Sequence, residues 1–436
     1  MTLGNMEISA ASSGRVDEAP GGASYKWFVL AMLALSNVLA SADRTVISVI
    51  AEPLKTDFHL SDKAIGFLSG FAFSATYSLV VLPIGYLIDR VDRRTLLSIA
   101  LSIWSVLTAL CATAGSFTTL VAARMGVGAA EAPSYSTSLS LIADLFPSTQ
   151  RNTAVSIYIG GAPLGALVIF LTGAQLLVHF SWRMVFLFGG APGLFLAVLF
   201  YFAAREPPRG AFDTNAELPT DAKSATKPLS LIASVYSVVG DPALRYAMAG
   251  LTISVGVLYS LGVWNTSFLV RQYGLTVSQG AVWTGLGFGA CMSVGAAFAG
   301  PLTDRFSKGD LRRVTLVPII AFVITIASAA MMVFGDGLVM ALVGVDMVGL
   351  MAGFFVPTGY ATILSLAAPE RRGTTMAVTT FATSFIGTGL TPLITGAISD
   401  AIGGPGALRT AILLTAMLLL IAAACYMRIW GLLTQR

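Results

Sequence analysis

The stretch GYLIDRVDRRTLLSIA, residues 85–100, places five charged residues between two apolar runs. A related stretch, GPLTDRFSKGDLRRVTLV, begins at Gly300. The first glycines of the two stretches are 215 positions apart, and so are Asp89 and Asp304, in a chain of 436 residues. A repeat of almost half the chain predicts two related halves, each with a charged turn at the same place.

The composition is that of a membrane protein. Hydrophobic residues make up 56% of the sequence and charged residues 11%, and the mean hydropathy is +0.80. Soluble domains carry about 25% charged residues. The net charge of +4 comes from basic residues scattered over short loops, which argues against a nucleic-acid partner. Three dispersed cysteines and two histidines give no metal-ligand pattern, so we expect neither a metal nor another cofactor.

Twelve apolar runs are long enough to span a membrane. They cover residues 26–50, 63–88, 95–115, 118–143, 152–177, 183–203, 243–270, 278–303, 314–334, 338–366, 373–397 and 406–429. We expect a disordered tail at 1–24, a six-helix bundle at 25–203, a polar linker at 204–241 and a second bundle at 242–430. The predicted fold is an all-α membrane protein with two pseudo-symmetric bundles.

Basic residues predict the orientation of the spans. If the N-terminus is cytoplasmic, 19 of the 26 Lys and Arg residues fall in inner segments and five in outer segments, while Arg44 and Arg124 lie within spans. Because basic loops remain in the cytoplasm, both termini are expected there. The short loops and compact length favour a multi-pass protein of a bacterial inner membrane.

The sequence resembles the major facilitator superfamily over nearly its whole length. The family's cytoplasmic signature, G-x-L-x-D-R-x-x-R-R, is matched by Gly85, Leu87, Asp89, Arg90, Arg93 and Arg94. The one departure is Asp92, which stands where the family usually has a glycine. The first half is most similar to the spinster group, through ADRTVISVIAEPLKTDFHLSD (42–62) and RMGVGAAEAPSY (124–135). Sugar-acid and organic-anion transporters share parts of these motifs. The resemblance implies transport by alternating access, with lipids such as lysophospholipids as substrates and protons coupled in some members.

The leading hypothesis is therefore a monomeric secondary transporter in contact with membrane lipids, which moves an anionic amphiphile such as a lysolipid. Protons are the expected energy source because no GxxxxGK[ST] nucleotide-binding loop is present. One alternative is a proton-coupled sugar-acid or organic-anion symporter. Another is a lipid-modifying membrane enzyme, which would need a nucleophile and base or a metal cluster that the spans do not display.

Charged residues inside the spans are candidate site residues, because each costs roughly 2.5–3.5 kcal/mol to insert. Arg124 and Glu131, seven residues apart in the fourth span, share a helix face about 10 Å apart. Asp43 of the first span lies at a depth comparable to Arg124, and Arg44 points about 100° away from it. We expect Asp43 and Glu131 to bind the coupled protons. Arg44 and Arg124 hold either these carboxylates or an anionic substrate group, and permanent structural pairing is the alternative.

The second half carries fewer such residues. Asp346 lies 215 positions after Glu131, but Val339 stands where the arginine partner would be. Asp346 is either a relay group or a structural polar contact. Polar and aromatic residues are expected to line the cavity, although any single aromatic is more often explained by helix packing. These residues are Tyr77, Tyr135, Tyr158, Trp264, Asn265, Phe268 and Phe381.

The charged turns are expected to form a cytoplasmic gate, made by Asp89, Arg90, Arg93, Asp304 and Arg305. Asp89 is placed to meet the start of the eleventh helix near Gly373, and Asp304 the start of the fifth near Asn152, where the helix dipole favours a carboxylate. These contacts would hold the cytoplasmic side closed while the cavity opens outward. Two stretches of small residues, GGAPLGA (160–166) and GTGLTP (387–392), are expected to permit close helix contacts and bending.

Overall fold

The computed structural model describes residues 22–88, 90–209, 240–308, 310–367 and 372–434. The expected tail at 1–24 and linker at 204–241 therefore lie mostly outside the described residues. The described elements are helices throughout, as the sequence predicts, and no strand occurs among them.

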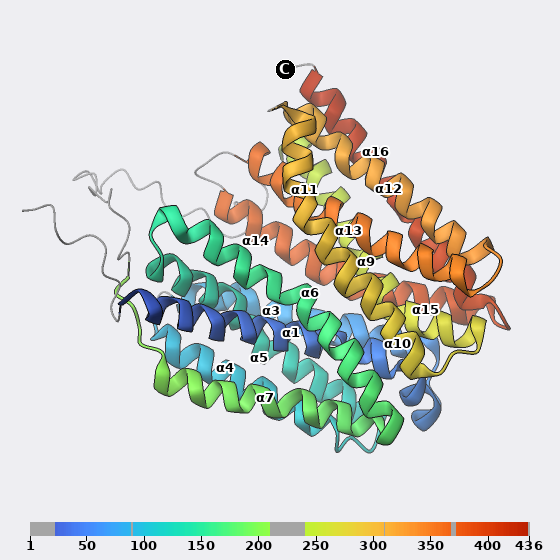
Figure 1. The fold of residues 1–436 in the computed structure, drawn as a ribbon, viewed down its shortest axis with the longest axis horizontal. Helices are drawn as coiled ribbons and strands as arrows, with labels where there is room; N and C mark the ends of the chain where they lie inside the picture. Colours follow the sequence, from blue (N-terminus) through green and yellow to red (C-terminus); the bar gives the residue numbers. More distant parts are fainter. Residues whose placement is uncertain (1–21, 89, 210–239, 309, 368–371, 435–436) are drawn as a thin grey trace, which may run out of the picture.

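Both halves are built from six helical segments (Figure 1). The first half contains α1 (Gly22–Phe58), α2 (Asp62–Gly66), the π-helical turn η1 (Phe67–Phe71), α3 (Ala72–Ile88), α4 (Arg93–Cys111), α5 (Phe117–Leu145), α6 (Ser148–His179) and α7 (Trp182–Ala203). The second half contains α9 (Pro242–Tyr273), α10 (Val277–Gly285), η2 (Leu286–Cys291), α11 (Met292–Ser307), α12 (Leu311–Phe334), α13 (Leu338–Leu366), α14 (Arg372–Ala382), η4 (Thr383–Leu390), α15 (Thr391–Ile402) and α16 (Ala407–Thr434). Each π-helical turn joins its flanking helices into one segment.

Eleven helical segments of the described chain are long and apolar enough to cross a membrane, so the protein is a multi-pass membrane protein. The remaining long helix, α5, has a serine- and threonine-rich half and carries Arg124 and Glu131. The first helix continues past the expected end of its span at residue 50 and includes Pro53. The twelve-segment arrangement agrees with the sequence prediction.

Local sequence explains where several segments begin. The hydroxyl of Ser61 accepts the backbone N–H of Ala64 at 3.2 Å and caps α2. A capping box formed by Thr276 and Gln279 starts α10 in the same way. Because the first backbone N–H groups of a helix have no partner within it, such side chains fix the position where the chain enters the helix.

Helices pack most extensively within their own half, as α1 does on α6 and α9 on α16. The two halves meet through α2, η1 and α3 against α15 and η4, through α6 against α10 and η2, and through α1 against α9. In Figure 1 the bundles converge on the right, near α10 and α15, and diverge to the left. We call the first the closed end, with the turns at 59–61, 274–276 and 403–406. The opposite end, with the turn at 90–92 and the end of α11 at Ser307, is the open end.

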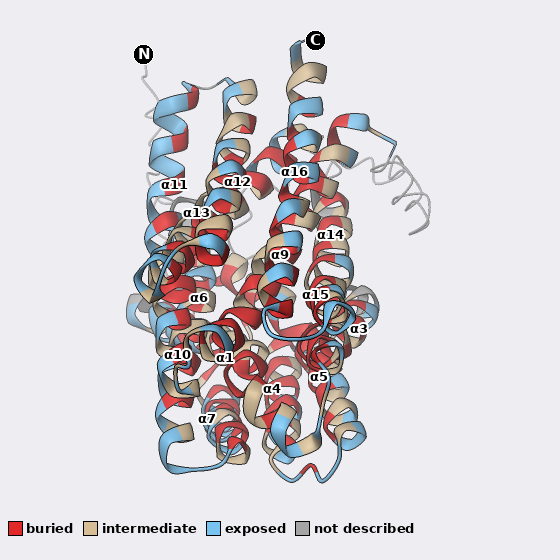
Figure 2. Cartoon of the chain, turned by 90° about the vertical axis from the view of Figure 1, so that its right-hand side faces the viewer, coloured by how far each residue is buried: buried red, intermediate tan, exposed pale blue. Residues whose placement is uncertain are grey.

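Small residues allow the two halves to approach closely at the closed end. A Cβ atom added to Gly70 would lie 2.6 Å from the carbonyl oxygen of Gly389, and one added to Gly66 would lie 2.3 Å from that of Pro392. GTGLTP (387–392) thus lies between the halves, whereas Gly161 and Gly165 of GGAPLGA pack on α1 within the first half. The buried residues gathered where α9, α15 and α1 meet are seen from the closed end in Figure 2.

Candidate functional site

The first half contains two ion pairs at membrane depth. In one of them, Nη1 of Arg124 on α5 donates to Oδ2 of Asp43 on α1 at 2.7 Å. Nη2 of the same arginine reaches the carbonyl oxygen of Asp43 at 3.2 Å, and the hydroxyl of Thr108 on α4 donates to Oδ1 at 2.7 Å. The side chains of Arg124 and Asp43 are 0% and 3% exposed. This pair is closed off from solvent and tied to a third helix.

The second pair joins Arg44 on α1 to Glu131 on α5. The side chain of Glu131 is 0% exposed, whereas that of Arg44 is 37% exposed. Oε2 of Glu131 is buried with no hydrogen-bond partner among the described residues. The Arg44 guanidinium lies 5.1 Å from the ring centre of Tyr77 and 5.4 Å from that of Phe73, both on α3.

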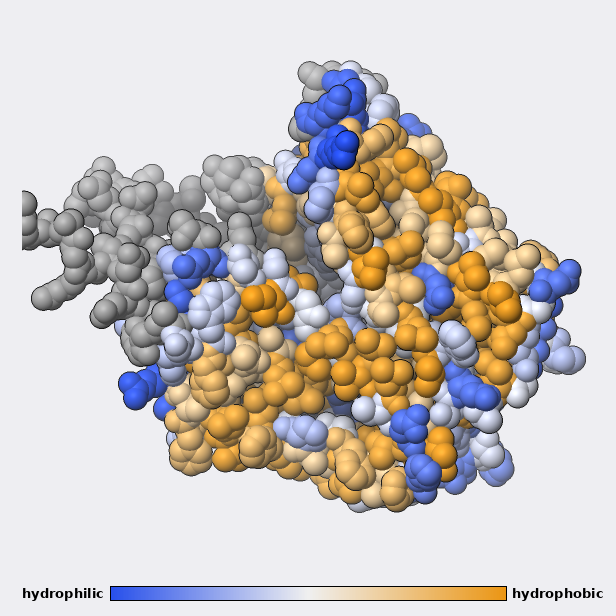
Figure 3. Space-filling view, viewed as in Figure 1, coloured by the Kyte–Doolittle hydropathy of each residue, from blue (hydrophilic) through white to orange (hydrophobic). Residues whose placement is uncertain are grey.

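Arg44 is accessible although it lies between the two halves. Its carbonyl oxygen is 3.2 Å from the hydroxyl of Tyr259 on α9, which also lies 3.1 Å from the carbonyl oxygen of Ser69. An internal residue that keeps a third of its side chain exposed faces a water-accessible space. Figure 3 shows a hollow between the bundles on their diverging side, bordered by pale, more polar atoms.

The helix geometry read from the sequence explains the pairing. Asp43 and Arg124 were expected at comparable depth and are in contact. Arg44 points away from Asp43 and meets Glu131, which shares a face with Arg124 about two turns further along α5. A buried ion pair that loses one partner is strongly destabilised. Of the two pairs, only Arg44–Glu131 has an accessible member that can exchange its partner without first exposing the core.

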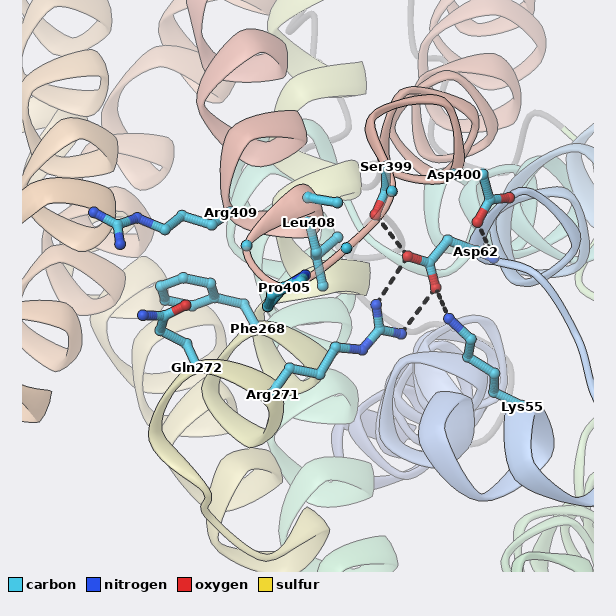
Figure 4. Close-up of a pocket in the computed structure, with 14 residues that line it drawn as sticks. Lys55, Asp62, Phe268, Arg271, Gln272, Ser399, Asp400, Pro405, Leu408 and Arg409 are labelled. Atoms are coloured by element: carbon cyan, nitrogen blue, oxygen red, sulfur yellow. Dashed lines mark hydrogen bonds and ion pairs between the residues drawn. The ribbon is translucent and has the colours of Figure 1, made fainter.

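A second charged cluster holds the closed end together, and the sequence did not single it out. Arg271 of α9 donates two hydrogen bonds to Asp62, the first residue of α2, at 2.8 and 2.9 Å (Figure 4). It also contacts Glu52 at 2.6 Å. Lys55 pairs with Asp62 as well, and the hydroxyl of Ser399 donates to Asp62 at 2.7 Å. Asp62 is therefore held from both halves.

Asp400 adds a link of a different kind. Its carboxylate accepts the backbone N–H groups of Asp62 at 2.9 Å and Lys63 at 2.7 Å, so a residue of α15 caps the start of α2. A pocket of about 320 Å³ lies beside this cluster and is bordered by Phe268, Arg271 and Arg409 (Figure 4). Opposite charges at neighbouring ends of the second and seventh spans could have indicated the Asp62–Arg271 pair. Nothing in their spacing could have indicated Ser399 or Asp400.

The predicted site residues of the second half do not gather into a comparable cluster. Asp346 on α13 is half-buried and has no hydrogen bond or ion pair among the described residues. Trp264 and Asn265 are completely buried; the indole of Trp264 donates to the carbonyl of Pro392 at 3.2 Å, and both amide atoms of Asn265 lack a partner in the described chain. Phe268 is also buried and packs edge-on against Tyr273. A cavity-lining role for these residues stays a prediction.

The other predicted lining residues lie near the interface of the halves or near Arg44. Tyr77 lies under the Arg44 guanidinium, and Tyr135 is 38% exposed, with its ring 5.8 Å from that of Tyr158. Phe381 stacks on Phe385 of η4 at 5.6 Å, and Phe385 in turn meets Phe71 of η1. An aromatic row therefore crosses between the halves.

The residues of the expected cytoplasmic gate lie at the open end. Asp89 is outside the described residues, while Asp304 and Arg305 are exposed and Arg90 lies in the turn. Arg93 is buried and bonds Asp144 at 2.6 Å and Glu206 at 2.7 Å, all within the first half. In the same turn, slight burial raises the pKa of Asp92. Hydrogen bonds from Thr95 lower it by more, so the pKa of Asp92 lies below its usual value. The gate stays a prediction for a state in which this end is closed.

Metal binding finds no support in the described residues, where no three His, Cys, Asp or Glu side chains gather into a ligand set. Two bundles that meet at one end and part at the other (Figure 1), with an accessible arginine between them, fit the passage of a small molecule through a bilayer. The protein is a transporter rather than an enzyme. It belongs to the Major Facilitator Superfamily, whose family model matches residues 33–387 and 283–434.

Similar proteins refine the placement within the superfamily. An MFS-type efflux pump of Mycolicibacterium smegmatis is 27% identical over 405 residues, which cover 92% of this chain and 91% of the relative. The probable galactarate/D-glucarate transporter GudP of Bacillus subtilis is 28% identical, with 87% of each chain covered. The crystal structure of a bacterial homologue of the human lysosomal transporter Spinster, inward-facing and unoccupied, superimposes with a TM-score of 0.84 at 27% identity, over 94% of this chain and 98% of that one. The resemblance to the spinster group is thus confirmed.

Proposed function

We propose that this transporter is a proton-coupled carrier of an anionic amphiphile, in which Arg44 and Glu131 form both the coupling pair and part of the binding site. The observation that carries the proposal is the asymmetry of that pair: Arg44 is accessible, while Glu131 is buried with one carboxylate oxygen unpartnered. A buried carboxylate that loses its cation takes up a proton. An anionic group that attracts Arg44 therefore favours protonation of Glu131.

The Asp43–Arg124 pair has a different role in this proposal. Both side chains are buried, and Thr108 occupies the remaining carboxylate oxygen of Asp43. A buried pair tied to a third helix fixes the relative position of α1, α4 and α5. It provides the rigid background against which Arg44 and Glu131 exchange partners, so we assign proton coupling to Glu131 and a positioning role to Asp43.

We assign the protein to a bacterial inner membrane, with the closed end facing the outside of the cell. The open end and both termini then face the cytoplasm. The count of basic residues, which favours the turns of the open end, supports this orientation. The similar spinster homologue was solved in an inward-facing conformation. The Asp62–Arg271 cluster is then the extracellular gate, and the two bundles at 25–203 and 242–430 are the units that rock against each other.

The substrate class follows from the surroundings of Arg44. A guanidinium suits a phosphate or carboxylate, and Phe73 and Tyr77 lie beside it. Tyr135 and the aromatic row of Phe71, Phe385 and Phe381 extend the apolar surface between the bundles. One accessible cation beside an extended apolar wall fits a molecule with an anionic head and an oily tail.

A sugar-acid symporter is the second candidate, because GudP of Bacillus subtilis is a probable galactarate/D-glucarate transporter. A sugar acid needs several hydrogen-bond donors and acceptors around its hydroxyl groups. In the second half, the polar residue Asn265 is completely buried. The wall beside Arg44 is aromatic, which favours the amphiphile.

The test is transport in proteoliposomes with an imposed pH gradient, with lysophospholipids and hexuronates as substrates. We expect gradient-driven flux of a lysolipid, lost in Arg44→Gln and independent of the gradient in Glu131→Gln, with Asp346→Asn as the matched control that keeps both. Transport of hexuronates without transport of lysophospholipids would refute the amphiphile as substrate and favour the sugar-acid symporter. Flux that ignores the gradient for every substrate would refute proton coupling.

A further inference from the structure

An apolar groove of about 260 Å³ runs over the second bundle between α11, α12 and α13. Its walls include Leu302, Phe306, Val317, Ile320, Ile324 and Phe354. Leu302, Phe306 and Ile320 are each about half exposed. Because these helices cross the membrane, the molecules that contact this surface are lipids.

Basic side chains lie at one end of the groove. Arg313 precedes Val317, Ile320 and Ile324 at the i, i+4, i+7 and i+11 spacing, so all four share one face of α12. From Arg313 to Ile324 this face is about 16 Å long. Arg305 lies next to Phe306 on α11. In Figure 3, blue atoms cover the ends of α11 and α12 above the orange surface of these helices.

The corresponding turn of the first half uses its arginines differently. Arg93 is saturated by Asp144 and Glu206, and Arg94 lies over the ring of Tyr201. In the second half, Arg305 and Arg313 are exposed and have no ion pair within the described residues. The turn from 304 to 313 holds four basic and two acidic side chains, and one of the acids, Asp310, caps α12 by accepting the N–H of Arg312.

We propose that this groove is a binding site for an anionic phospholipid, with one acyl chain along α12 and the phosphate group between Arg305 and Arg313. The apolar lining accounts for the chain, and the unpaired guanidiniums account for the headgroup. The site is separate from Arg44 and Glu131 and does not depend on what the protein transports. A lipid held there links α11 to α12 at the open end of the second bundle.

Native mass spectrometry of the purified full-length protein, titrated with dioleoyl phosphatidylglycerol or dioleoyl phosphatidylcholine, tests the proposal. Phosphatidylglycerol is expected to bind the wild-type protein more tightly. At about 1 kcal/mol for each basic residue near a phosphate, Arg305→Gln/Arg313→Gln should weaken its binding roughly 30-fold. The matched control Arg245→Gln/Arg428→Gln removes two exposed arginines predicted to face the same side of the membrane, and it should bind as the wild type does.

Three results would overturn the proposal. An equal loss of phosphatidylglycerol binding in the control variant would show that the lipid is attracted by surface charge in general and not by a specific site. Equal binding of dihexanoyl phosphatidylglycerol would remove the groove from the interaction, since short chains cannot fill it. Loss of binding in Arg44→Gln, with Arg305→Gln/Arg313→Gln unaffected, would place the lipid in the transport path instead.

Discussion

In the first bundle, four charged side chains lie at membrane depth and all are paired, Asp43 with Arg124 and Arg44 with Glu131. The second bundle repeats the helix order, yet at a similar place it holds Asp346, which has no partner among the described residues. The repeat has thus kept the path of the chain and the charged turns, but not the interior charges. In the proposed mechanism, this bundle therefore responds to protons, and the other serves as the wall it moves against.

The closed end differs from both interiors, because its charges join the bundles. Asp62 of the first half is held by Arg271 and Ser399 of the second, and Asp400 caps the start of α2. Breaking contacts within a bundle costs stability. Breaking contacts between bundles changes which end is open. This distinction gives an order of expected effects.

The largest effect is expected for Asp43→Asn. The change leaves the completely buried Arg124 without its counter-ion, and removing one member of a buried pair costs about 3–5 kcal/mol. The melting temperature of the purified protein should fall sharply. Asp346→Asn, the matched change in the second bundle, should leave it nearly unchanged. Equal melting temperatures for the two variants would contradict the contrast between the bundles.

A smaller effect, on conformation rather than folding, is expected for Arg271→Gln. Charge-assisted hydrogen bonds contribute about 1.5–3 kcal/mol each, and Arg271 donates two of them to Asp62 across the closed end. Spin labels at that end should show longer distances, with little change in melting temperature. Arg409→Gln, which alters the same pocket without touching Asp62, is the control. Unchanged distances in Arg271→Gln would exclude the cluster as a gate.

The smallest effect is expected for Tyr259→Phe. The change removes one hydroxyl that links α9 to the carbonyl oxygens of Arg44 and Ser69, a contribution of about 1 kcal/mol. The same spin labels should report a modest shift toward opening of the closed end. Unchanged spin-label distances in Tyr259→Phe would show that the ion pairs and the small residues hold the halves together without this hydroxyl.

The sequence predicts the twelve segments, the two halves, and the depth and facing of the charged residues in the first bundle, because these depend on local properties. For the arginines it offers two alternatives, pairing with the carboxylates or binding the substrate. Apolar length determines the spans, and the spacing of Arg124 and Glu131 determines which face each one presents. The full cluster at the closed end could not be predicted, because Ser399 lies 337 residues from Asp62 and nothing in their spacing links them. Such contacts depend on the angle between the bundles. Trp264 and Asn265, expected at the cavity wall, are completely buried, and the indole of Trp264 bonds Pro392 within its own half.

The central claim is that Glu131 couples protonation to conformation. It can be tested without a known substrate, by spin labels introduced as His59→Cys and Thr410→Cys, at exposed positions on the two halves near the closed end, in a background lacking the three native cysteines. In the wild type, the distance distribution is predicted to shift between high and low pH. In Glu131→Gln it should be independent of pH, while Asp346→Asn should behave as the wild type. A pH response that survives Glu131→Gln and disappears in Asp346→Asn would contradict the account and place the coupling in the second bundle.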